Sequence, residues 1–395
     1  MASTKKKVLL FTDWYEPGYK AGGPIQSCRN IVNLLGSDVD FYVVTSDRDL
    51  GDTAAYTGIE TDAWLAKGDI NIYYGSPGQL TAKKIREIFH QVNPDVVYLN
   101  SMFSFRYTII PLLVIRKTGF RGKIVLAPRG MLTDSALATK KWKKRPFLLA
   151  FSSSSVSKRI LFHATSQQEI AEIRKTMGNK ANIMLAANVP RISGSIIEKE
   201  KREGQLNCIY LSRIHPIKNL QFALDVFEGI KDLRNIRFDI FGPVEDEQYY
   251  AKCFELATKL EKNIEVNFMG PLNHGYLANT LKDYHLFFLP TKGENFGHAI
   301  FEALASGCPV LISDQTPWQD LDANNAGWSI SLNEPEEFRK RIREIYLLDN
   351  FSMNEKSHAA FEYAKNHVSS ANLRKNYSTL FGLEVNEPSD AHPRA

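Results

Sequence analysis

One stretch in the second half of the chain constrains the fold more than any other. It begins with four apolar residues that predict a strand (286–289) and continues as a polar, glycine-bearing loop (290–297). A short helical pattern follows (298–306), Gly307 ends it, and the apolar run 310–312 predicts the next strand. Strand, loop, helix and strand in this order form half of an open α/β sheet. Such sheets bind ligands where their strands end.

Two carboxylates flank this loop, Glu294 and Glu302, with seven residues between them. Glu302 lies among mostly apolar residues of the predicted helix, where a lone carboxylate needs a partner. That partner is either a local lysine or a ligand that offers hydroxyl groups, such as the cis-diol of a ribose. Glu294, in the loop, can accept hydrogen bonds from sugar hydroxyls.

Strand and helix patterns alternate twice along the chain. The first series covers residues 8–190, and a second series begins after the charged segment 191–203, which has no apolar period. We therefore predict an α/β protein with two Rossmann-like domains, each a doubly wound parallel sheet, facing each other across a cleft. The predicted boundaries are 1–195 and 196–370, and the polar tail 384–395 is predicted to be disordered.

The composition excludes several classes of protein. The chain of 395 residues is 44% hydrophobic and 24% charged, which is typical of a soluble globular protein. No apolar run approaches the roughly 20 residues of a transmembrane helix, and the basic N-terminus lacks the apolar run of a signal peptide. Four scattered cysteines without metal-site spacing fit a reducing cytoplasm. The net charge of +5 gives no argument for a nucleic-acid partner.

Three loops at predicted strand ends in the first half offer ligand contacts. Gly22 and Gly23 precede the first helix and let backbone N–H groups approach a ligand, although a plain turn explains them equally well. Arg129 is placed for an anionic or hydroxyl-rich ligand, with a surface arginine before a turn as the alternative. Asn100 and Ser101 follow another strand and are candidates for the acceptor side.

Cations occupy a strand-end loop in the second half. Arg213 and Lys218 lie five residues apart, so both can reach one diphosphate, the arginine as a fork and the lysine as a point charge. The N–H groups of Gly297 and His298 at a helix start add dipoles toward the same anion. A plain surface loop explains Arg213 and Lys218 taken alone. Diphosphate, ribose and sugar sites together describe a nucleotide-sugar.

These residues resemble a known family. The spacing Glu294-x7-Glu302, with the run from Glu302 to Val310, looks like the signature of retaining glycosyltransferases of family 4, which have the GT-B fold. Further matches extend over most of the chain: Ser212-Arg213 with Lys218, Gly22-Gly23-Pro24, Phe241-Gly242-Pro243 and Pro128-Arg129-Gly130-Met131-Leu132. The resemblance also implies a last helix at 371–383 that packs back on the N-terminal domain.

The resemblance implies a role for each site residue. Arg213 and Lys218 would neutralise the departing diphosphate, Glu302 would hold the ribose, and Glu294 would hold the transferred sugar. The predicted catalytic residues are Glu294, Arg213 and Lys218. The predicted donor-binding residues are Gly22, Gly23, Arg129, Gly270, Leu272, Asn295, Phe296, Gly297, His298 and Glu302. The residues predicted for the acceptor side are Asn100 and Ser101.

The implied chemistry retains the configuration of the sugar and needs no metal or other cofactor. The departing phosphate helps to deprotonate the acceptor hydroxyl, while cations and a helix dipole take the place of a metal. Asp38 and Asp40 match the Asp-x-Asp spelling of some metal-dependent transferases. They lie at the entry end of a predicted strand, away from the ligand edge, so we predict no metal site there.

The chain departs from the family at one position. Many members carry a histidine where this chain has Asn100, which can hydrogen-bond a sugar hydroxyl but cannot act as an acid or base. His163 and His298 are not obvious substitutes, and His163 fits a buried core residue equally well. A nucleotide-sugar-binding protein without turnover is therefore one alternative. A nucleotide-sugar epimerase of the same fold is another, although the pair of glutamates favours a transferase.

The densest basic cluster precedes an apolar segment at 146–151. Its members are Lys140, Lys141, Trp142, Lys143, Lys144 and Arg145. Cations around a tryptophan suit an anionic membrane surface, while a solvated helix face or a core segment is the alternative. We therefore predict an acceptor in a lipid-linked or bacterial surface glycan, and a location in the cytoplasm at the inner face of the plasma membrane.

Overall fold

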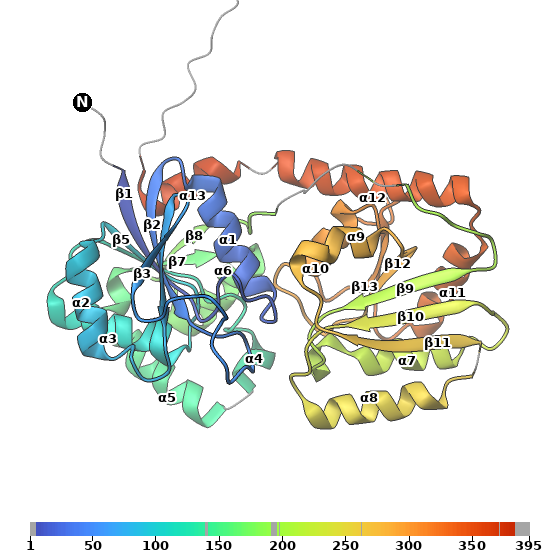
Figure 1. Cartoon of the computed structure of the whole chain (residues 1–395), viewed down its shortest axis with the longest axis horizontal. Coiled ribbons are helices and arrows are strands. Elements are labelled where there is room, and N and C mark those ends of the chain that lie inside the picture. The colour runs from blue at the N-terminus through green and yellow to red at the C-terminus, as the bar shows by residue number, and fades with distance from the viewer. Residues whose placement is uncertain are drawn as a thin grey trace, which may run out of the picture. The chain divides into compact units, whose positions relative to one another are not determined.

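The computed structural model describes residues 5–138, 141–190, 196, 198–261, 263–370 and 372–383 (Figure 1). The chain divides into two compact units. Unit 1 comprises Met1–Pro17, Ser27–Val189 and Asn372–Ala395, and unit 2 comprises Gly18–Gln26 and Pro190–Ala371. Lys140 and the tail predicted to be disordered (384–395) lie outside the described residues.

Unit 1 is built on an eight-stranded sheet with the order β3-β4-β2-β1-β5-β6-β7-β8. Its strands are β1 (Lys6–Phe11), β2 (Val39–Ser46), β3 (Trp64–Lys67), β4 (Ile70–Gly75), β5 (Val96–Leu99), β6 (Lys123–Leu126), β7 (Ile160–Ala164) and β8 (Asn182–Leu185). The described pairs are parallel except β3 with β4. The sequence did not predict the short edge strand β3, because its residues are only partly buried and lack a clear alternation.

Helices cover both faces of this sheet. They are α1 (Gly23–Leu35), α2 (Ala82–Val92), α3 (Ile110–Thr118), α4 (Asp134–Ala138), α5 (Lys141–Ser152), α6 (Gln167–Met177) and α13 (Leu373–Phe381). A short π-helical turn, η1 (Phe105–Ile109), runs into α3, and a 3-10 turn, η2 (Ser157–Arg159), lies between α5 and β7. Val8, Leu9, Leu10 and Phe11 of β1 are all fully buried, so neither face of the central strand meets solvent. A continuous apolar run of this kind is typical of a parallel strand covered on both sides.

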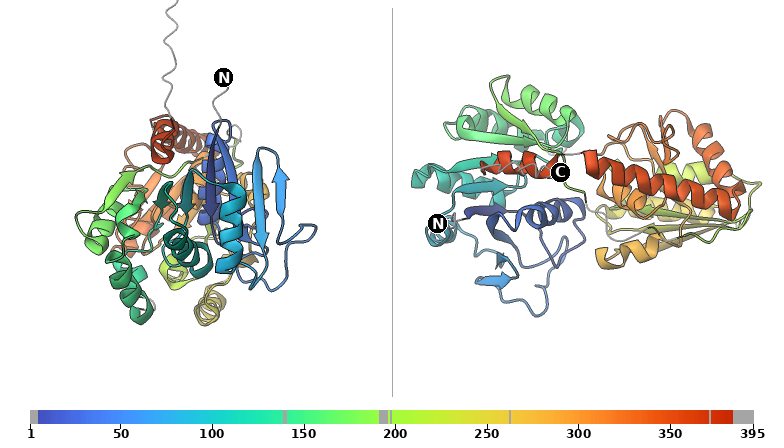
Figure 2. Two further views of the ribbon diagram at one scale, coloured as in Figure 1. Left: turned by 90° about the vertical axis from the view of Figure 1, so that its left-hand side faces the viewer. Right: turned by 90° about the horizontal axis from the view of Figure 1, so that it is seen from above.

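The last helix, α13, belongs to unit 1 although it ends the described chain (Figure 2). Phe381 packs edge-on against Phe41 and Tyr98 of the sheet. The Tyr377 hydroxyl donates to the Ala187 carbonyl at 3.1 Å. At the carboxyl end of α13, the Lys123 ammonium donates to a backbone carbonyl, which favours that helix terminus electrostatically.

Unit 2 has a six-stranded sheet with the order β11-β10-β9-β12-β13-β14, all of whose described pairs are parallel. Its strands are β9 (Leu206–Leu211), β10 (Ile236–Phe241), β11 (Ile264–Gly270), β12 (Leu286–Leu289), β13 (Val310–Ser313) and β14 (Gly327–Ile330). Its helices are α7 (Leu220–Glu228), α8 (Glu247–Lys259), α9 (Leu277–Leu281), α10 (His298–Ala305), α11 (Pro335–Leu347) and α12 (Asn350–Ser370), with the turns η3 (Pro216–Lys218) and η4 (His274–Tyr276). The prediction of a doubly wound α/β fold with two parallel sheets is confirmed.

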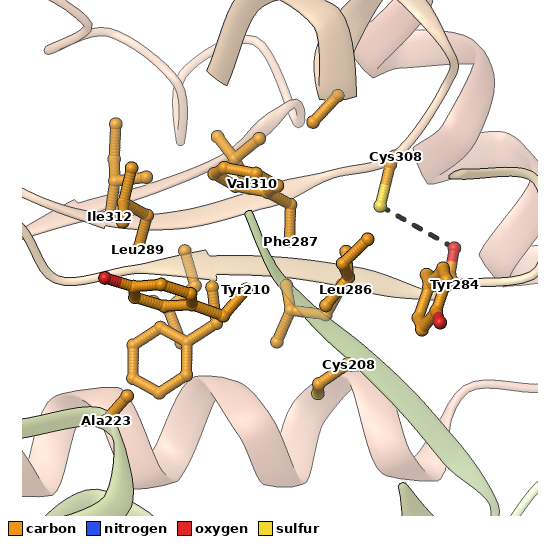
Figure 3. Packing of buried hydrophobic residues seen from close by; sticks show 14 of the residues in the cluster. Cys208, Tyr210, Ala223, Tyr284, Leu286, Phe287, Leu289, Cys308, Val310 and Ile312 are labelled. Atoms are coloured by element: carbon orange, nitrogen blue, oxygen red, sulfur yellow. Dashed lines mark hydrogen bonds between the residues drawn. The ribbon is translucent and has the colours of Figure 1, made fainter. Parts of the chain in front are cut away.

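The core of unit 2 surrounds the strand pair of β12 and β13 (Figure 3). Phe287 pairs in register with Val310, and Leu289 with Ile312, so each pair presents its side chains to the same face. The Cys308 thiol lies 3.6 Å from the Tyr284 carbonyl. The strong burial of this pair makes the ends of β12 and β13 a rigid platform for the loops that follow them.

Candidate functional site

The strand order of unit 2 reverses between β9 and β12, and the candidate site lies where these two neighbours end. Chain order runs outward from β9 to β11 on one side and from β12 to β14 on the other. Loops at such a reversal point diverge, which leaves room for a ligand. The two loops are nevertheless tied together, because the Ile217 carbonyl accepts hydrogen bonds from Lys292 N at 2.7 Å and Thr291 Oγ1 at 3.1 Å.

The reversal point brings together a lysine and a glutamate that the sequence predicts to be catalytic. Lys218 Nζ lies 2.5 Å from Glu294 Oε1, and only 10% and 15% of their side chains are exposed. Lys218 closes the turn η3, which is fixed by His215 Nδ1 accepting from Ile217 N at 3.2 Å. Two mostly buried charges of opposite sign therefore face each other where the strand order of unit 2 reverses.

Gly297 lies directly before α10, and its position leaves no room for a side chain. Its φ is 77°, a conformation that favours glycine, and an added Cβ would lie 2.7 Å from Ile300 Cδ1. The first N–H groups of α10 follow directly in the chain from this residue. The start of a helix offers N–H donors and a partial positive charge to an anion.

Glu302 lies one turn further along α10 and has a partner that the sequence did not identify. His274 Nδ1 is 3.4 Å from Glu302 Oε1, and the glutamate side chain is 19% exposed. His274 belongs to η4, which follows β11 and the predicted donor-binding residues Gly270 and Leu272. The structure thus brings the loop after β11 to the carboxylate predicted to hold the ribose. Only the position of His274 shortly after a strand end could have drawn attention to it.

Arg213 lies at the end of β9 but pairs with a different carboxylate. Arg213 Nη1 is 2.5 Å from Glu245 Oε2, with side-chain exposures of 36% and 35%. Its loop is fixed by Gly242, where an added Cβ would lie 1.8 Å from the Ser212 carbonyl oxygen. Arg213 and Lys218 therefore pair with different carboxylates, and nothing in the sequence identifies Glu245 as the partner of Arg213.

The remaining predicted donor residues of unit 2 surround the start of α10. Phe296 is 8% exposed and its ring lies 4.9 Å from that of His298. Residues 18–26 are grouped with unit 2, and an added Cβ on Gly23 would lie 3.3 Å from His298 Cδ2. Gly22, with φ 64°, precedes it. Asn295 stands in the same loop as Phe296.

The predicted residues of unit 1 form a separate polar network. Arg129 donates through Nε to Asn100 Oδ1 at 2.8 Å, through Nη1 to Asn188 Oδ1 at 2.6 Å and through Nη2 to Tyr98 Oη at 2.8 Å. Asn100 is 3% exposed and also lies 3.4 Å from Thr12 Oγ1. The alternative of a surface arginine is wrong, because the guanidinium is engaged inside unit 1.

Ser101 lies next to this network. It is 3% exposed, its hydroxyl lies 3.6 Å from Met131 Sδ, and its carbonyl accepts from Thr108 Oγ1 at 2.7 Å. Asn100 and Ser101 follow β5, which neighbours β1 where the strand order of unit 1 reverses. The candidates for the acceptor side therefore lie at the carboxyl ends of the parallel strands, the edge at which sheets of this kind bind ligands.

His163 is a neutral core residue. Its Nδ1 accepts from the Tyr98 hydroxyl at 2.9 Å and its Nε2 donates to the Ala186 carbonyl at 2.8 Å. Burial lowers the pKa of His163 to about 3, with the Arg129 charge acting in the same direction. Both ring nitrogens are thus occupied by structural hydrogen bonds.

Asp38, the first residue of the Asp-x-Asp sequence, forms an ion pair with Arg374 inside unit 1. Among the described residues, no group of three or more histidine, cysteine, aspartate or glutamate side chains is placed to hold a metal ion. The described helices also include none that is long and apolar enough to cross a membrane.

Comparison with known proteins finds a family model that resembles the second half of the chain. Residues 195–367 match the model of "Glycosyl transferases group 1". Two curated proteins are also similar to the chain in sequence. The chain is 27% identical over 151 residues to the UDP-N-acetylglucosamine–peptide N-acetylglucosaminyltransferase GtfA subunit of Streptococcus agalactiae, which covers 36% of this chain and 28% of that protein. The chain thus spans little more than a quarter of that relative.

A second relative matches over a greater length. The chain is 24% identical over 324 residues to alpha-monoglucosyldiacylglycerol synthase of Streptococcus pneumoniae strain R6, covering 77% of this chain and 70% of that protein. Among solved structures, Anabaena HepE in complex with UDP and glucose has a TM-score of 0.67 at 13% identity, covering 96% of this chain and all of that chain. Residues 195–367 are therefore similar to glycosyl transferases group 1, and the chain has the GT-B fold.

Proposed function

We propose that the protein transfers a sugar from a nucleotide-diphosphate donor to a hydroxyl acceptor, with retention of configuration and without a metal. The observation that carries this proposal is the Lys218–Glu294 pair at the reversal point of unit 2, 2.5 Å apart beside the start of α10. A cation and helix N–H groups suit a diphosphate, and a neighbouring carboxylate suits a sugar.

Each group has a distinct task in this proposal. Negative charge grows on the diphosphate as the bond from its oxygen to the anomeric carbon breaks, and the Lys218 ammonium and the first N–H groups of α10 stabilise that charge. Arg213, at the same strand end, adds a second cation. The acceptor oxygen bonds to the anomeric carbon on the same face, and its proton passes to the departing phosphate oxygen. When the donor binds, its phosphate pairs with Lys218 in place of Glu294. Glu294 is then free to accept hydrogen bonds from the hydroxyl groups of the sugar.

Glu302 and His274 provide the nucleoside end of the site. Their contact of 3.4 Å places a carboxylate from α10 beside the loop that follows β11. The carboxylate accepts from the ribose diol, while backbone groups near Gly270 and Leu272 contact the base. This arrangement orders base, ribose, diphosphate and sugar along the ends of β11, α10 and β9.

We further propose that the acceptor is a lipid-linked or surface glycan and that α5 attaches the protein to an anionic membrane. Trp142, Pro146 and Leu149 follow each other at i, i+4 and i+7 and so lie on one face of α5. Trp142 is 75% exposed and Leu149 is 72% exposed. An apolar ridge that faces solvent is typical of a helix that lies in a membrane interface.

The charges on α5 support an anionic surface as the occupant. Exposed Lys143 and Arg145 flank the ridge, with the Lys143 ammonium 4.6 Å from the centre of the Trp142 ring, and the helix contains no acidic residue. Lys144 instead donates to the Ala136 carbonyl at 2.6 Å and lies over the Phe103 ring. Of the predicted basic cluster, Lys144 therefore points into unit 1, Lys140 lies outside the described residues, and the side chain of Lys141 is not described.

The enzymatic proposal is tested with purified protein and UDP-, GDP-, ADP- and TDP-sugars. Donor binding should raise the melting temperature by linkage, and turnover with a glycan or glycolipid acceptor should give a product whose anomeric configuration NMR shows to be that of the donor. Incubation with donor alone distinguishes the alternatives. An epimerised sugar would establish the epimerase, and binding without product from any acceptor would establish a binding protein.

The membrane proposal is tested by flotation with vesicles of phosphatidylglycerol or of phosphatidylcholine at low salt. The protein should float with the anionic vesicles, and Trp142→Ser with Leu149→Ser should abolish flotation. Phe351→Ser is the matched control, because Phe351 is 70% exposed but lies on α12 of unit 2. If Phe351→Ser reduces flotation as much as the substitutions in α5 do, the assignment of membrane binding to α5 is overturned.

A further inference from the structure

The loop 290–297 of the candidate site is held along its length by the segment 313–318, which begins at the last residue of β13. The Ser313 hydroxyl donates to the Thr291 carbonyl. Glu294 N donates to the Gln315 carbonyl at 3.0 Å. The third contact is from Trp318, whose Nε1 donates to the Phe296 carbonyl at 2.5 Å. The segment 313–318, which we call the brace, therefore fixes the loop at its start, middle and end.

Trp318 is itself rigidly held. It is 2% exposed, and its backbone N donates to Thr316 Oγ1 at 3.2 Å. Its ring packs against aromatic rings from three elements at centroid distances of 5.3 Å for Phe296, 6.2 Å for Phe301, 4.7 Å for His367 and 6.1 Å for Tyr363. Packing of this kind leaves the indole one orientation, so the direction of its N–H is fixed.

The hydrogen bond from Trp318 determines the orientation of one peptide group. The Phe296 carbonyl and the Gly297 N–H belong to the same planar peptide, and in a trans peptide they point in opposite directions. Because Trp318 holds the carbonyl on its own side, the Gly297 N–H is directed away from the indole. Gly297, with φ 77°, has broad freedom of rotation and would not hold this orientation unaided.

We propose that Trp318 is a positioning residue that aims the Gly297 N–H at the anion of a bound donor. The inference rests on the proposed function, since it deepens the account of the same site. Trp318 touches the loop from its buried side, and it acts through the Phe296–Gly297 peptide. An N–H donor that is fixed before the ligand arrives stabilises developing charge without reorganisation.

Unit 2 contains a matched control for this tryptophan. Trp328 on β14 is also 2% exposed, and among the described residues its Nε1 has no hydrogen-bond partner. Its ring packs beneath the Lys356 ammonium at 4.3 Å. Replacing either tryptophan by phenylalanine removes an indole N–H and part of a buried ring, but only at position 318 does the substitution remove a bond to the loop.

The test compares Trp318→Phe with Trp328→Phe in the full chain. A sharper pair replaces each tryptophan by benzothienylalanine, which exchanges only the N–H for sulfur. We expect kcat/KM for the donor to fall by about tenfold or more at position 318, with a higher KM and a lower kcat, and by less than twofold at position 328. Melting temperatures should be closely similar for the two benzothienylalanine proteins. Equal kcat/KM values at the two positions would overturn the proposal.

A second readout separates this inference from the proposed function. The chain contains five tryptophans, so the indole N–H region of a ¹⁵N spectrum is simple, and Trp318→Phe identifies one signal by its loss. That signal should exchange slowly and shift when UDP or GDP is added, while the Trp328 signal should not shift. If no acceptor is turned over, the proposed transfer fails, but a tenfold loss of nucleotide affinity in Trp318→Phe alone still supports the positioning role. Unchanged affinity would then overturn it.

Discussion

Lys218 and Glu294 are separated by 76 residues in the sequence, and their side chains meet at 2.5 Å where β9 and β12 end side by side. Neither charge is far from water, but each is mostly enclosed, with 10% and 15% of the side chain exposed. Each therefore depends on the other until a ligand offers new partners.

The first prediction is a coupling between these two residues. Lys218→Met and Glu294→Gln should each reduce turnover at least a hundredfold, because each removes a charge or hydrogen bond that acts on the transferred group. Each should also destabilise the protein by about 1–3 kcal/mol, since the remaining partner stays enclosed without its counterpart. The double variant should be no less stable than either single variant. Urea unfolding of all four proteins provides the measurement.

An exposed ion pair provides the control for this comparison of single and double variants. Lys340 Nζ lies 3.2 Å from Glu337 Oε1, but 65% and 32% of these side chains are exposed. Breaking this pair should change stability by less than about 1 kcal/mol and leave turnover unaltered. A coupling energy for Lys218 and Glu294 as small as that of the surface pair would contradict the prediction.

The second prediction concerns Glu302 and the ribose. Glu302→Gln should weaken nucleoside diphosphate binding by about tenfold, because a neutral amide oxygen accepts hydrogen bonds less strongly than a carboxylate. The wild-type protein should also discriminate against a 2′-deoxy nucleotide, and the variant should discriminate less. Isothermal titration with both nucleotides checks this, and a variant that discriminates as strongly as the wild type would remove Glu302 from the ribose site.

The third prediction assigns Arg129 to the stability of unit 1. Arg129→Met removes the donor at 2.8 Å from Asn100 Oδ1 and the donor at 2.6 Å from Asn188 Oδ1, to which the Ser27 hydroxyl also donates at 3.3 Å. We expect a loss of about 2–4 kcal/mol in the free energy of unfolding of unit 1. Arg121→Met, at an exposed position of the same unit, should cost less than about 0.5 kcal/mol. Hydrogen exchange measured by mass spectrometry follows unit 1 separately from unit 2.

The fourth prediction concerns acid stability. Burial lowers the pKa of His163 to about 3, and burial lowers the pKa of His285 in unit 2 to about 4. Between these values and the unfolded value near 6.5, the unfolded chain binds more protons than the native one, so stability falls as the pH falls. The stability from each histidine is fully present above about pH 6.5. Each contribution is on the order of a few kcal/mol.

The measurement for this prediction is thermal unfolding from pH 7 to pH 4. His163→Gln, which carries no charge at any pH, should flatten the profile of unit 1, and the exposed His358→Gln should leave the profile as it is. A wild-type melting temperature that stays constant over this range would count against the prediction.

The alternation of apolar runs was enough to predict the fold class. The unbroken run at 286–289 indicates a strand buried on both faces, and β12 is such a strand. Gly307 was correctly predicted to follow the helix that ends at Ala305. These features depend on residues that are adjacent in the sequence, so they can be predicted without knowledge of the tertiary structure.

The partners of the site residues could not be predicted in this way. His274 beside Glu302, Glu245 beside Arg213 and Trp318 beneath Phe296 are each brought into contact by the packing of different elements. Nothing in the neighbouring sequence of a glutamate or a histidine specifies which distant loop will face it. The roles assigned to Arg213, Lys218 and the two glutamates stay predictions until the variants are measured.

The position of α13 affects the order in which the chain can fold as it is made. The core of unit 1 is closed by Phe381 against Phe41 and Tyr98, and by Tyr377 against His163. The ribosome therefore synthesises the first strand of unit 1 early. It completes the core of unit 1 by adding α13 only after all of unit 2 has been made. We expect nascent chains that stop before residue 372 to contain a protease-resistant unit 2 and a unit 1 that remains open to cleavage.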